Sequence, residues 1–219
     1  MVIMKKIIFL TIFFLSIAVL SCKSEVKQNF DHSEEEEISM SDKTKKAVFG
    51  GGCFWCVEAV FQQVEGVEAA INGYAGGRKE DPNYDEVCSG TTGHAEVVQV
   101  SYDPEKVSFE ELLEIFFKTH DPTTMNRQGA DVGTQYRSVI FYKDKKQKEK
   151  AEKWIDIINK SDIYDNDVVT EVSPLEKFYP AEEVHQNYYQ NNPNQPYCSV
   201  VIGPKINKLE KLFKEKLKN

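Results

Sequence analysis

Two cysteines close together, Cys53 and Cys56, are the residues whose types and spacing point most directly to chemistry. Gly51 and Gly52 precede Cys53, and apolar residues at helical spacing follow it, so a tight turn is expected to place Cys53 in the first turn of a helix. Free N–H groups and the helix dipole favour an anion there, which predicts a lowered pKa and a nucleophilic thiolate for Cys53. Cys56 lies one turn further on the same face, close enough for disulfide exchange.

Three plainer interpretations of this pair compete: inert core packing, half of a zinc site, and a structural disulfide. Zinc sites of this kind need four ligands, and the sequence offers no second Cys-x-x-Cys or close histidine pair, so no metal is expected. Core packing does not require a glycine pair before the cysteines. The Cys-x-x-Cys alone leaves a thioredoxin-like disulfide oxidoreductase open as an alternative function.

The elements that must position these thiols can be read from hydrophobic periodicity. Strand patterns cover residues 47–50, 67–74, 95–102, 136–142 and 167–172, and helical patterns cover 53–62, 108–120, 145–160 and part of the tail from 180. Strands and helices alternate, but without the strict rhythm of a doubly wound sheet. The expected fold class is α+β, a two-layer sandwich of a mixed β-sheet with flanking helices.

A carboxyl group lies on an apolar strand face within this pattern. Alternation along residues 95–102 puts Glu96 on the same face as Val98, Val100 and Tyr102. Burial there would raise its pKa and keep it protonated near neutral pH, the form that can donate a proton. A salt-bridged carboxylate at the strand end is the alternative.

Four motifs in register resemble those of the A-type peptide methionine sulfoxide reductases. They are Gly51-Gly52-Cys53-Phe54-Trp55, Asn83-Tyr84-Asp85-Glu86-Val87-Cys88-Ser89-Gly90, Thr92-Gly93-His94-Ala95-Glu96-Val97 and Asp131-Val132-Gly133-Thr134-Gln135-Tyr136-Arg137-Ser138. The resemblance covers about residues 47–204. It implies a mixed sheet flanked by helices and thiol-dependent reduction of the S epimer of methionine sulfoxide, free or in proteins, with no metal, flavin or nucleotide cofactor.

The resemblance also implies roles for individual residues. Cys53 would attack the sulfoxide sulfur, Glu96 would act as general acid, and Tyr84 and Tyr136 would donate hydrogen bonds to the oxygen. A sulfoxide is a poor electrophile until its oxygen is protonated or strongly hydrogen-bonded, so these residue types suit the reaction. Without the resemblance, the two tyrosines would be interpreted as core residues with satisfied hydroxyls.

The substrate would be held by neighbouring residues. Phe54 and Trp55 could wall an apolar pocket for the S-methyl group, although aromatic residues at a helix start also suit the core. Asp131 matches a position that orders the site or grips the substrate. His185 matches a family position with its role left open, and Cys88 is expected to be a buried thiol beside the site.

The sulfenic acid left on Cys53 needs a second thiol, and two candidates stand in the sequence. Cys198 matches the C-terminal resolving position of many family members and is expected on a flexible tail, whereas Cys56 is one helical turn away. The commonest family pattern has glycine at the position of Cys56. Cys198 is slightly favoured, with Cys56 as a relay, and a thioredoxin-type dithiol would then regenerate the enzyme.

The pattern of the N-terminal segment predicts an export signal. Lys5 and Lys6 precede an uncharged, mostly apolar run over residues 7–20, too short to span a bilayer comfortably. Val19-Leu20-Ser21-Cys22 resembles a bacterial lipobox, which predicts lipidation of Cys22 and anchoring to a membrane of the cell envelope; an ordinary signal peptide is the alternative. The expected organisation is a signal peptide over 1–21, an acidic disordered tether over 22–45 and a reductase domain over 46–219.

The amino-acid composition argues against one further class of function. The chain has 219 residues, and 27 Lys and Arg against 35 Asp and Glu give a formal net charge of −8. This acidity argues against nucleic-acid binding, and the domain is expected to be monomeric, with methionine sulfoxide-containing proteins as substrates. A surface lipoprotein that merely binds a partner, with all cysteines structural, is a further alternative.

Overall fold

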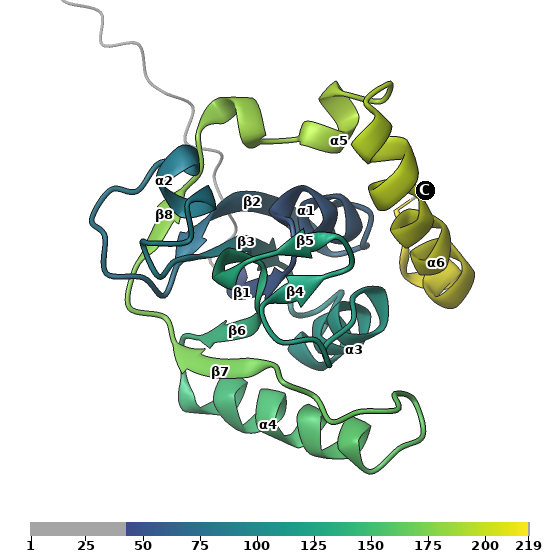
Figure 1. Cartoon of the computed structure of the whole chain (residues 1–219). Coiled ribbons are helices and arrows are strands. Elements are labelled where there is room, and N and C mark those ends of the chain that lie inside the picture. The colour runs from purple at the N-terminus through teal and green to yellow at the C-terminus, as the bar shows by residue number, and fades with distance from the viewer. Residues whose placement is uncertain (1–42, 219) are drawn as a thin grey trace, which may run out of the picture. The chain divides into compact units, whose positions relative to one another are not determined.

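A six-stranded sheet forms the centre of the computed structural model, which describes residues 43–218 (Figure 1). The strand order is β7-β6-β1-β3-β2-β8, with every neighbouring pair antiparallel except β6 and β7. The strands are β1 Lys45–Gly51, β2 Val67–Ala75, β3 Ala95–Tyr102, β6 Ser138–Tyr142, β7 Glu171–Pro174 and β8 Phe178–Pro180; β4 Arg127–Gln128 and β5 Asp131–Val132 form a separate hairpin. The expected α+β fold with a mixed sheet is confirmed.

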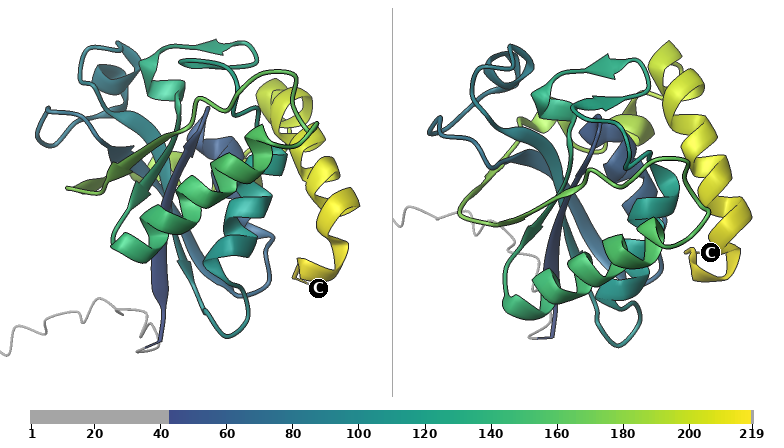
Figure 2. Two further views of the ribbon diagram at one scale, coloured as in Figure 1. Left: turned by 90° about the horizontal axis from the view of Figure 1, so that it is seen from below. Right: turned by 60° about the horizontal axis from the view of Figure 1, so that its bottom comes forward.

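The helices pack mainly against one face of this sheet. They are α1 Phe54–Gln62, α2 Tyr84–Cys88, α3 Phe109–Thr119, α4 Lys145–Asn159, α5 Tyr188–Asn191 and α6 Gly203–Phe213, with a π-helical turn, η3, over Cys198–Ile202. Helices α3, α4 and α6 lie on the same side of the sheet (Figure 2). The large core between the layers contains Phe49, whose ring lies 5.1 Å from those of Phe61 and Phe116.

The opposite face of the sheet has a smaller apolar cluster. Its buried members alternate with those of the large core along the strands: Val48, Ala75, Ala95, Val97, Val139 and Phe141. Leu175, from the connection between β7 and β8, and Phe178, the first residue of β8, pack against them. The sheet is therefore buried on both faces, which explains the nearly continuous apolar runs in its central strands.

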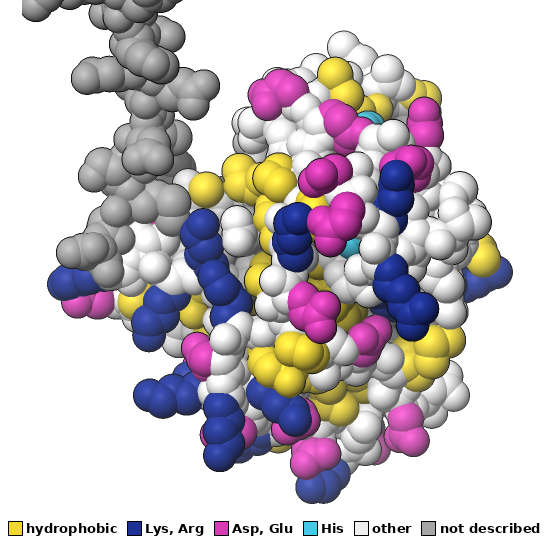
Figure 3. Space-filling view, turned by 90° about the vertical axis from the view of Figure 1, so that its left-hand side faces the viewer, with side chains coloured by type: hydrophobic (Ala, Val, Ile, Leu, Met, Phe, Trp, Pro, Cys, Tyr) yellow, Lys and Arg dark blue, Asp and Glu magenta, His cyan; other side chains and the backbone are white. Residues whose placement is uncertain are grey.

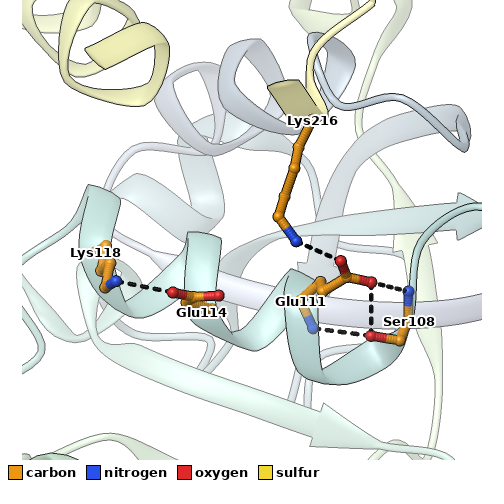
Figure 4. A network of polar contacts seen from close by, with 5 residues as sticks. All are labelled: Ser108, Glu111, Glu114, Lys118 and Lys216. Atoms are coloured by element: carbon orange, nitrogen blue, oxygen red, sulfur yellow. Dashed lines mark hydrogen bonds and ion pairs between the residues drawn. The ribbon is translucent and has the colours of Figure 1, made fainter. Parts of the chain in front are cut away.

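Helix α3 begins with a capping box that also anchors the C-terminus. The Ser108 side chain accepts a hydrogen bond from the Glu111 N–H, and the Glu111 carboxylate accepts from the Ser108 N–H at 2.8 Å. Lys216 donates to the same carboxylate, whereas Glu114 and Lys118 form a separate pair at 2.8 Å one turn along the helix (Figure 4). The start of the helix predicted over residues 108–120 is confirmed.

Two predicted strands have different limits in the structure. The strand expected over residues 167–172 starts only at Glu171, because the Val168 N–H donates to the Asn159 side chain and the Val169 N–H to the Pro122 carbonyl. Tyr136 belongs to a 3-10 turn, Thr134–Tyr136, instead of the start of β6. The periodicity was present in both segments, but tertiary hydrogen bonds occupy the N–H groups of Val168 and Val169, and a local turn bond to the Gly133 carbonyl occupies that of Tyr136.

The surface carries many isolated ion pairs. On the side where α2 and β8 lie in Figure 1, acidic and basic side chains are interspersed (Figure 3). Most of the ion pairs join well exposed side chains, as in Lys177–Glu80 at 2.8 Å. Such pairs contribute little to stability. Among residues 43–218, no helix is both long and apolar enough to cross a bilayer.

The predictions for the N-terminal segment lie outside the described residues. They concern the signal peptide over 1–21, lipidation of Cys22 and most of the tether over 22–45. The described part of the chain begins at Lys43, two residues before β1.

Candidate active site

The turn between β1 and α1 places Cys53. Gly52 has a φ of +91°, a left-handed conformation that favours glycine, and a Cβ atom there would lie 2.5 Å from the Gln128 Cβ. Cys53 is consequently the N-cap of α1, one position before the first turn in which it was expected. Its side chain is buried, with 6% of its surface exposed.

The expected lowering of the Cys53 pKa is wrong for this site. Burial raises the pKa of the Cys53 thiol well above its ordinary value, and the hydrogen bond with Cys56 and the charges of Cys56 and Glu96 act in the same direction. The pKa of Cys56 is lowered, chiefly because the Cys53 thiol hydrogen-bonds to it. The directions of these two shifts favour a negative charge on Cys56 over one on Cys53. The sequence indicated that a helix starts at Cys53, but it did not indicate that the Cys53 side chain would be buried there.

Glu96 is buried directly beside the helix start. Its side chain is 1% exposed, and its Oε2 accepts a hydrogen bond from the Phe54 N–H at 3.0 Å. Burial raises the pKa of Glu96 to about 8, outweighing this hydrogen bond, which favours the carboxylate. The predicted burial and raised pKa are thus confirmed, and Glu96 is mostly protonated at neutral pH.

Two tyrosine hydroxyls lie around the same carboxyl group. Tyr84 begins α2, where the Asn83 side chain caps the helix, and its own N–H donates to Glu182 at 2.8 Å. Burial raises the pKa of Tyr84 and of Tyr136, and the Glu96 charge adds to both shifts, so both hydroxyls stay protonated as donors. The sequence-predicted Tyr84, Tyr136 and Glu96 are therefore brought together.

Cys88 lies within this group of polar side chains. Its sulfur is 3.9 Å from Glu96 Oε1, and it hydrogen-bonds with the hydroxyls of Tyr84 and Tyr136. The expected position beside the site is confirmed, but Cys88 is half-buried instead of buried. Its small thiol occupies the place between the donors to which a polar substrate atom could bind.

Asp131 contacts the thiol pair through a residue that sequence reasoning missed. The Tyr197 hydroxyl donates a hydrogen bond to Asp131 Oδ2 at 2.7 Å and lies 3.9 Å from Cys56 Sγ. Tyr197 directly precedes Cys198 in the sequence, and no role was predicted for it. Nothing in its own sequence context indicated that it would reach across to the β4–β5 hairpin, 66 residues earlier.

Aromatic side chains form one wall of the site. Phe54 is fully buried, whereas Trp55 is half-buried and stacks on Tyr188 with ring centres 3.7 Å apart. The His185 ring lies 4.2 Å from the Tyr84 ring and 5.7 Å from the Trp55 ring. Of the two residues predicted to wall a substrate pocket, Trp55 reaches the surface and Phe54 supports it from the core.

A buried carboxylate fixes the segment that carries this wall. Glu58, completely buried on α1, accepts hydrogen bonds from the N–H groups of Asn187 at 2.7 Å and Tyr188 at 3.2 Å. Asn187 has a φ of 54°, so the chain turns sharply there. Sequence reasoning missed Glu58, although a charged residue among the apolar positions of the helix was a signal that could have found it.

The expected flexible tail at Cys198 is not found. Cys198 is completely buried at the start of η3. Burial raises its pKa, and the charge of Cys56 adds to the shift. Cys198 also lies at the edge of a surface hollow of about 350 Å³, lined in addition by Gln63, Tyr189, Gln190, Pro193 and Ser199. Within residues 43–218 no group of three or more His, Cys, Asp or Glu side chains is arranged to hold a metal ion.

The family model of the peptide methionine sulfoxide reductases matches residues 45–217. The chain belongs to this family. A relative from Nautilia profundicola, the peptide methionine sulfoxide reductase MsrA, is 60% identical over 173 residues, which are 79% of this chain and 98% of that protein. The MsrA of an Acinetobacter baumannii strain is 54% identical over 175 residues, 80% of this chain and 99% of that one.

Solved structures of the family agree with the fold. The reduced form of Saccharomyces cerevisiae Mxr1 is similar, with a TM-score of 0.68 and 35% identity over 73% of this chain and 91% of that one. Methionine sulfoxide reductase A of Corynebacterium diphtheriae has a TM-score of 0.63 and 36% identity over 69% of this chain and 76% of that one. The protein is a peptide methionine sulfoxide reductase, an oxidoreductase that repairs oxidised proteins.

Replacement of Gly52 by alanine tests how strictly the reductase depends on the turn before Cys53. Gly52→Ala should lower the free energy of unfolding by roughly 1–3 kcal/mol beyond the cost of the left-handed backbone alone, because the added Cβ overlaps Gln128. It should also reduce the specific activity, because it displaces Cys53. Gly129→Ala is the matched control: its φ is +60°, and no atom lies within 4 Å of the added Cβ. Urea unfolding and sulfoxide turnover measure both effects. Equal losses in the two variants would contradict the steric argument.

Proposed function

We propose that Cys53 is the nucleophile, Glu96 the general acid, and Tyr84 and Tyr136 the donors that hold the sulfoxide oxygen. The Cys53 sulfur attacks the sulfoxide sulfur and is oxidised by two electrons, while the substrate sulfur is reduced by two and leaves as methionine. Glu96 delivers a proton to the oxygen, which ends on Cys53 as the hydroxyl of a sulfenic acid, and the thiol proton leaves to solvent. The observation that carries this proposal is the buried Glu96, mostly protonated at neutral pH, bonded to the N–H next to Cys53.

The aromatic wall gives the substrate its place. Trp55, stacked on Tyr188 and supported by Phe54, offers an apolar surface for the S-methyl group, since methyl and sulfur groups pack well against aromatic rings. Asp131, held by Tyr197, closes the polar side. Donors on one side and an aromatic wall on the other distinguish the two sulfoxide epimers, and we assign the S epimer as substrate.

The proposed route of the oxidising equivalents runs from Cys53 to Cys56 and then to Cys198. Cys56 hydrogen-bonds with Cys53 and is favoured over it as the site of a negative charge, so it is ready to condense with the sulfenic acid. The pKa of Cys198 responds to the charge of Cys56, and Cys198 borders the surface hollow. A thioredoxin-type dithiol, the proposed electron donor, would attack the resulting disulfide from that hollow.

The first experiment follows both sulfoxide epimers with dithiothreitol as reductant. The S epimer alone should be turned over, and Cys53→Ser should abolish turnover because it removes the nucleophile. With a thioredoxin-type reductant, Cys56→Ser and Cys198→Ser should each slow steady-state turnover while one equivalent of methionine still forms in a single turnover. Reduction of insulin disulfides without any sulfoxide turnover would instead support the thioredoxin-like alternative.

The pH dependence of the reductive step tests Glu96. The protonated acid is the active form, so the rate of methionine formation should fall as the pH rises through about 8. Glu96→Gln should lower this rate by roughly 10²- to 10⁴-fold and should remove the decline at alkaline pH. Single-turnover rates between pH 6 and 10 provide the measurement. A decline that persists in Glu96→Gln would assign it to another group.

We further propose that the enzyme is exported and anchored by lipid on Cys22, with the acidic segment as a tether and the domain monomeric. The lipobox-like Val19-Leu20-Ser21-Cys22 supports this proposal. The mature protein should carry an acyl mass on Cys22 and partition into detergent, whereas Cys22→Ser should be soluble with unchanged kinetics. A mature mass without an acyl group would contradict lipidation and leave the enzymology intact.

A further inference from the structure

A cation from α6 reaches the environment of Cys56. Lys205 is half-buried near the start of α6, and its Nζ donates to the Thr119 carbonyl at the end of α3 at 3.4 Å. Lys205 and Cys56 line the same small cavity of about 10 Å³, together with Gly51, Thr119 and His120. Two segments separated by almost 150 residues are therefore packed so that Lys205 borders the same cavity as the second cysteine of the Cys-x-x-Cys, and its positive charge favours a negative charge on Cys56.

The other titratable groups around Cys56 do not supply this positive charge. Besides Cys53 on its own helix, those that face it from the neighbouring elements are Lys205, Asp131, Tyr197, Cys198, Glu96 and His120. His120 is neutral, because burial lowers its pKa to about 3. Asp131 opposes a negative charge on Cys56, whereas Lys205 and the Tyr197 hydroxyl favour one. Among these groups Lys205 is the cation.

We propose that Lys205 is a positioning residue of the resolving step: its ammonium group holds Cys56 as the thiolate that attacks the Cys53 sulfenic acid. This inference rests on the proposed function, in which Cys56 is the first thiol to react with that sulfenic acid. The Cys56 sulfur forms an S–S bond with Cys53, the Cys53 S–O bond breaks, and the hydroxide takes up a proton and leaves as water. Cys56 is oxidised and Cys53 reduced, so the disulfide retains the two oxidising equivalents that Cys53 took from the sulfoxide.

The contribution of Lys205 matters most after the sulfoxide has been reduced. In the resting site, the hydrogen bond from the Cys53 thiol is the largest influence that favours charge on Cys56. That thiol hydrogen is absent once Cys53 carries the sulfenic acid. Of the groups that favour charge on Cys56, Lys205 then acts through a full charge on a half-buried side chain, and because Cys56 itself is buried, solvent screens this charge only in part.

A titration of Cys56 as the single thiol tests the proposal directly. The chain can start at Ser41, because the matched segment corresponds to 98% of the length of the Nautilia relative. Cys53→Ser, Cys88→Ser and Cys198→Ser leave Cys56 alone, and the serine that replaces Cys53 keeps a hydroxyl donor there. Thiolate absorbance at 240 nm, followed against pH, should show that Lys205→Met raises the apparent Cys56 pKa by about one unit, an approximately tenfold loss of thiolate below the pKa.

Two matched variants separate charge from packing. Lys205→Arg keeps the cation and should restore most of the shift. Lys208→Met removes the same charge one turn further along α6, where the side chain is exposed, and should leave the Cys56 titration unchanged. An unchanged titration in Lys205→Met, or an equal shift in Lys208→Met, would overturn the proposal.

Single-turnover kinetics with the natural cysteines present connect the titration to the reaction. After one equivalent of the S epimer, Lys205→Met should accumulate several-fold more dimedone-trapped sulfenic acid on Cys53 and form the Cys53–Cys56 disulfide correspondingly later. If Cys53–Cys198 forms first, the role of Lys205 in resolution is overturned even when the titration responds. If the unsubstituted enzyme releases no methionine, the proposed function itself fails, a result that the thiol titration does not depend on.

Discussion

The hydrogen bond between the Phe54 N–H and the buried Glu96 carboxyl group is the contact on which the active site depends. It joins the first residue of α1 to the central strand β3 and so fixes the distance between the acid and the adjacent Cys53. The helix start would on its own favour a carboxylate. Burial on an apolar sheet face is stronger and keeps Glu96 protonated, which is the form that the proposed proton transfer requires.

The parts of this site that could be predicted from the sequence are those set by local periodicity. Alternation alone placed Glu96 on the buried face of its strand, and the glycine pair before Cys53 indicated a helix start. The Asp131–Tyr197–Cys56 contact and the position of Lys205 beside Cys56 depend on how the C-terminal segment folds back over α1. No local pattern encodes that packing, and so neither was found before the structure.

Buried polar groups hold the part of the C-terminal segment that precedes η3, whereas apolar side chains of η3 and α6 pack into the large core. Glu58 accepts two backbone N–H groups from the part before η3, and the Gln186 side chain bonds to the backbone of Asn72 on β2. Such contacts specify one arrangement, because a shift would leave buried donors and acceptors unpaired. The segment can therefore bring the Tyr188 ring, the Tyr197 hydroxyl and the Cys198 thiol to the site without a large core of its own.

Burial has opposite consequences for the two groups that must act together. It makes Glu96 an acid at neutral pH, but it also raises the pKa of Cys53 and so reduces the thiolate available for attack. The charge of Cys56 also contributes to the raised pKa of Glu96, so a negative charge on Cys56 helps to keep this acid protonated. In the proposed reaction Cys53 then needs to become nucleophilic only at the moment when Glu96 protonates the sulfoxide oxygen. A dry site with a shared charge thus favours simultaneous proton transfer and attack over a preformed thiolate at Cys53.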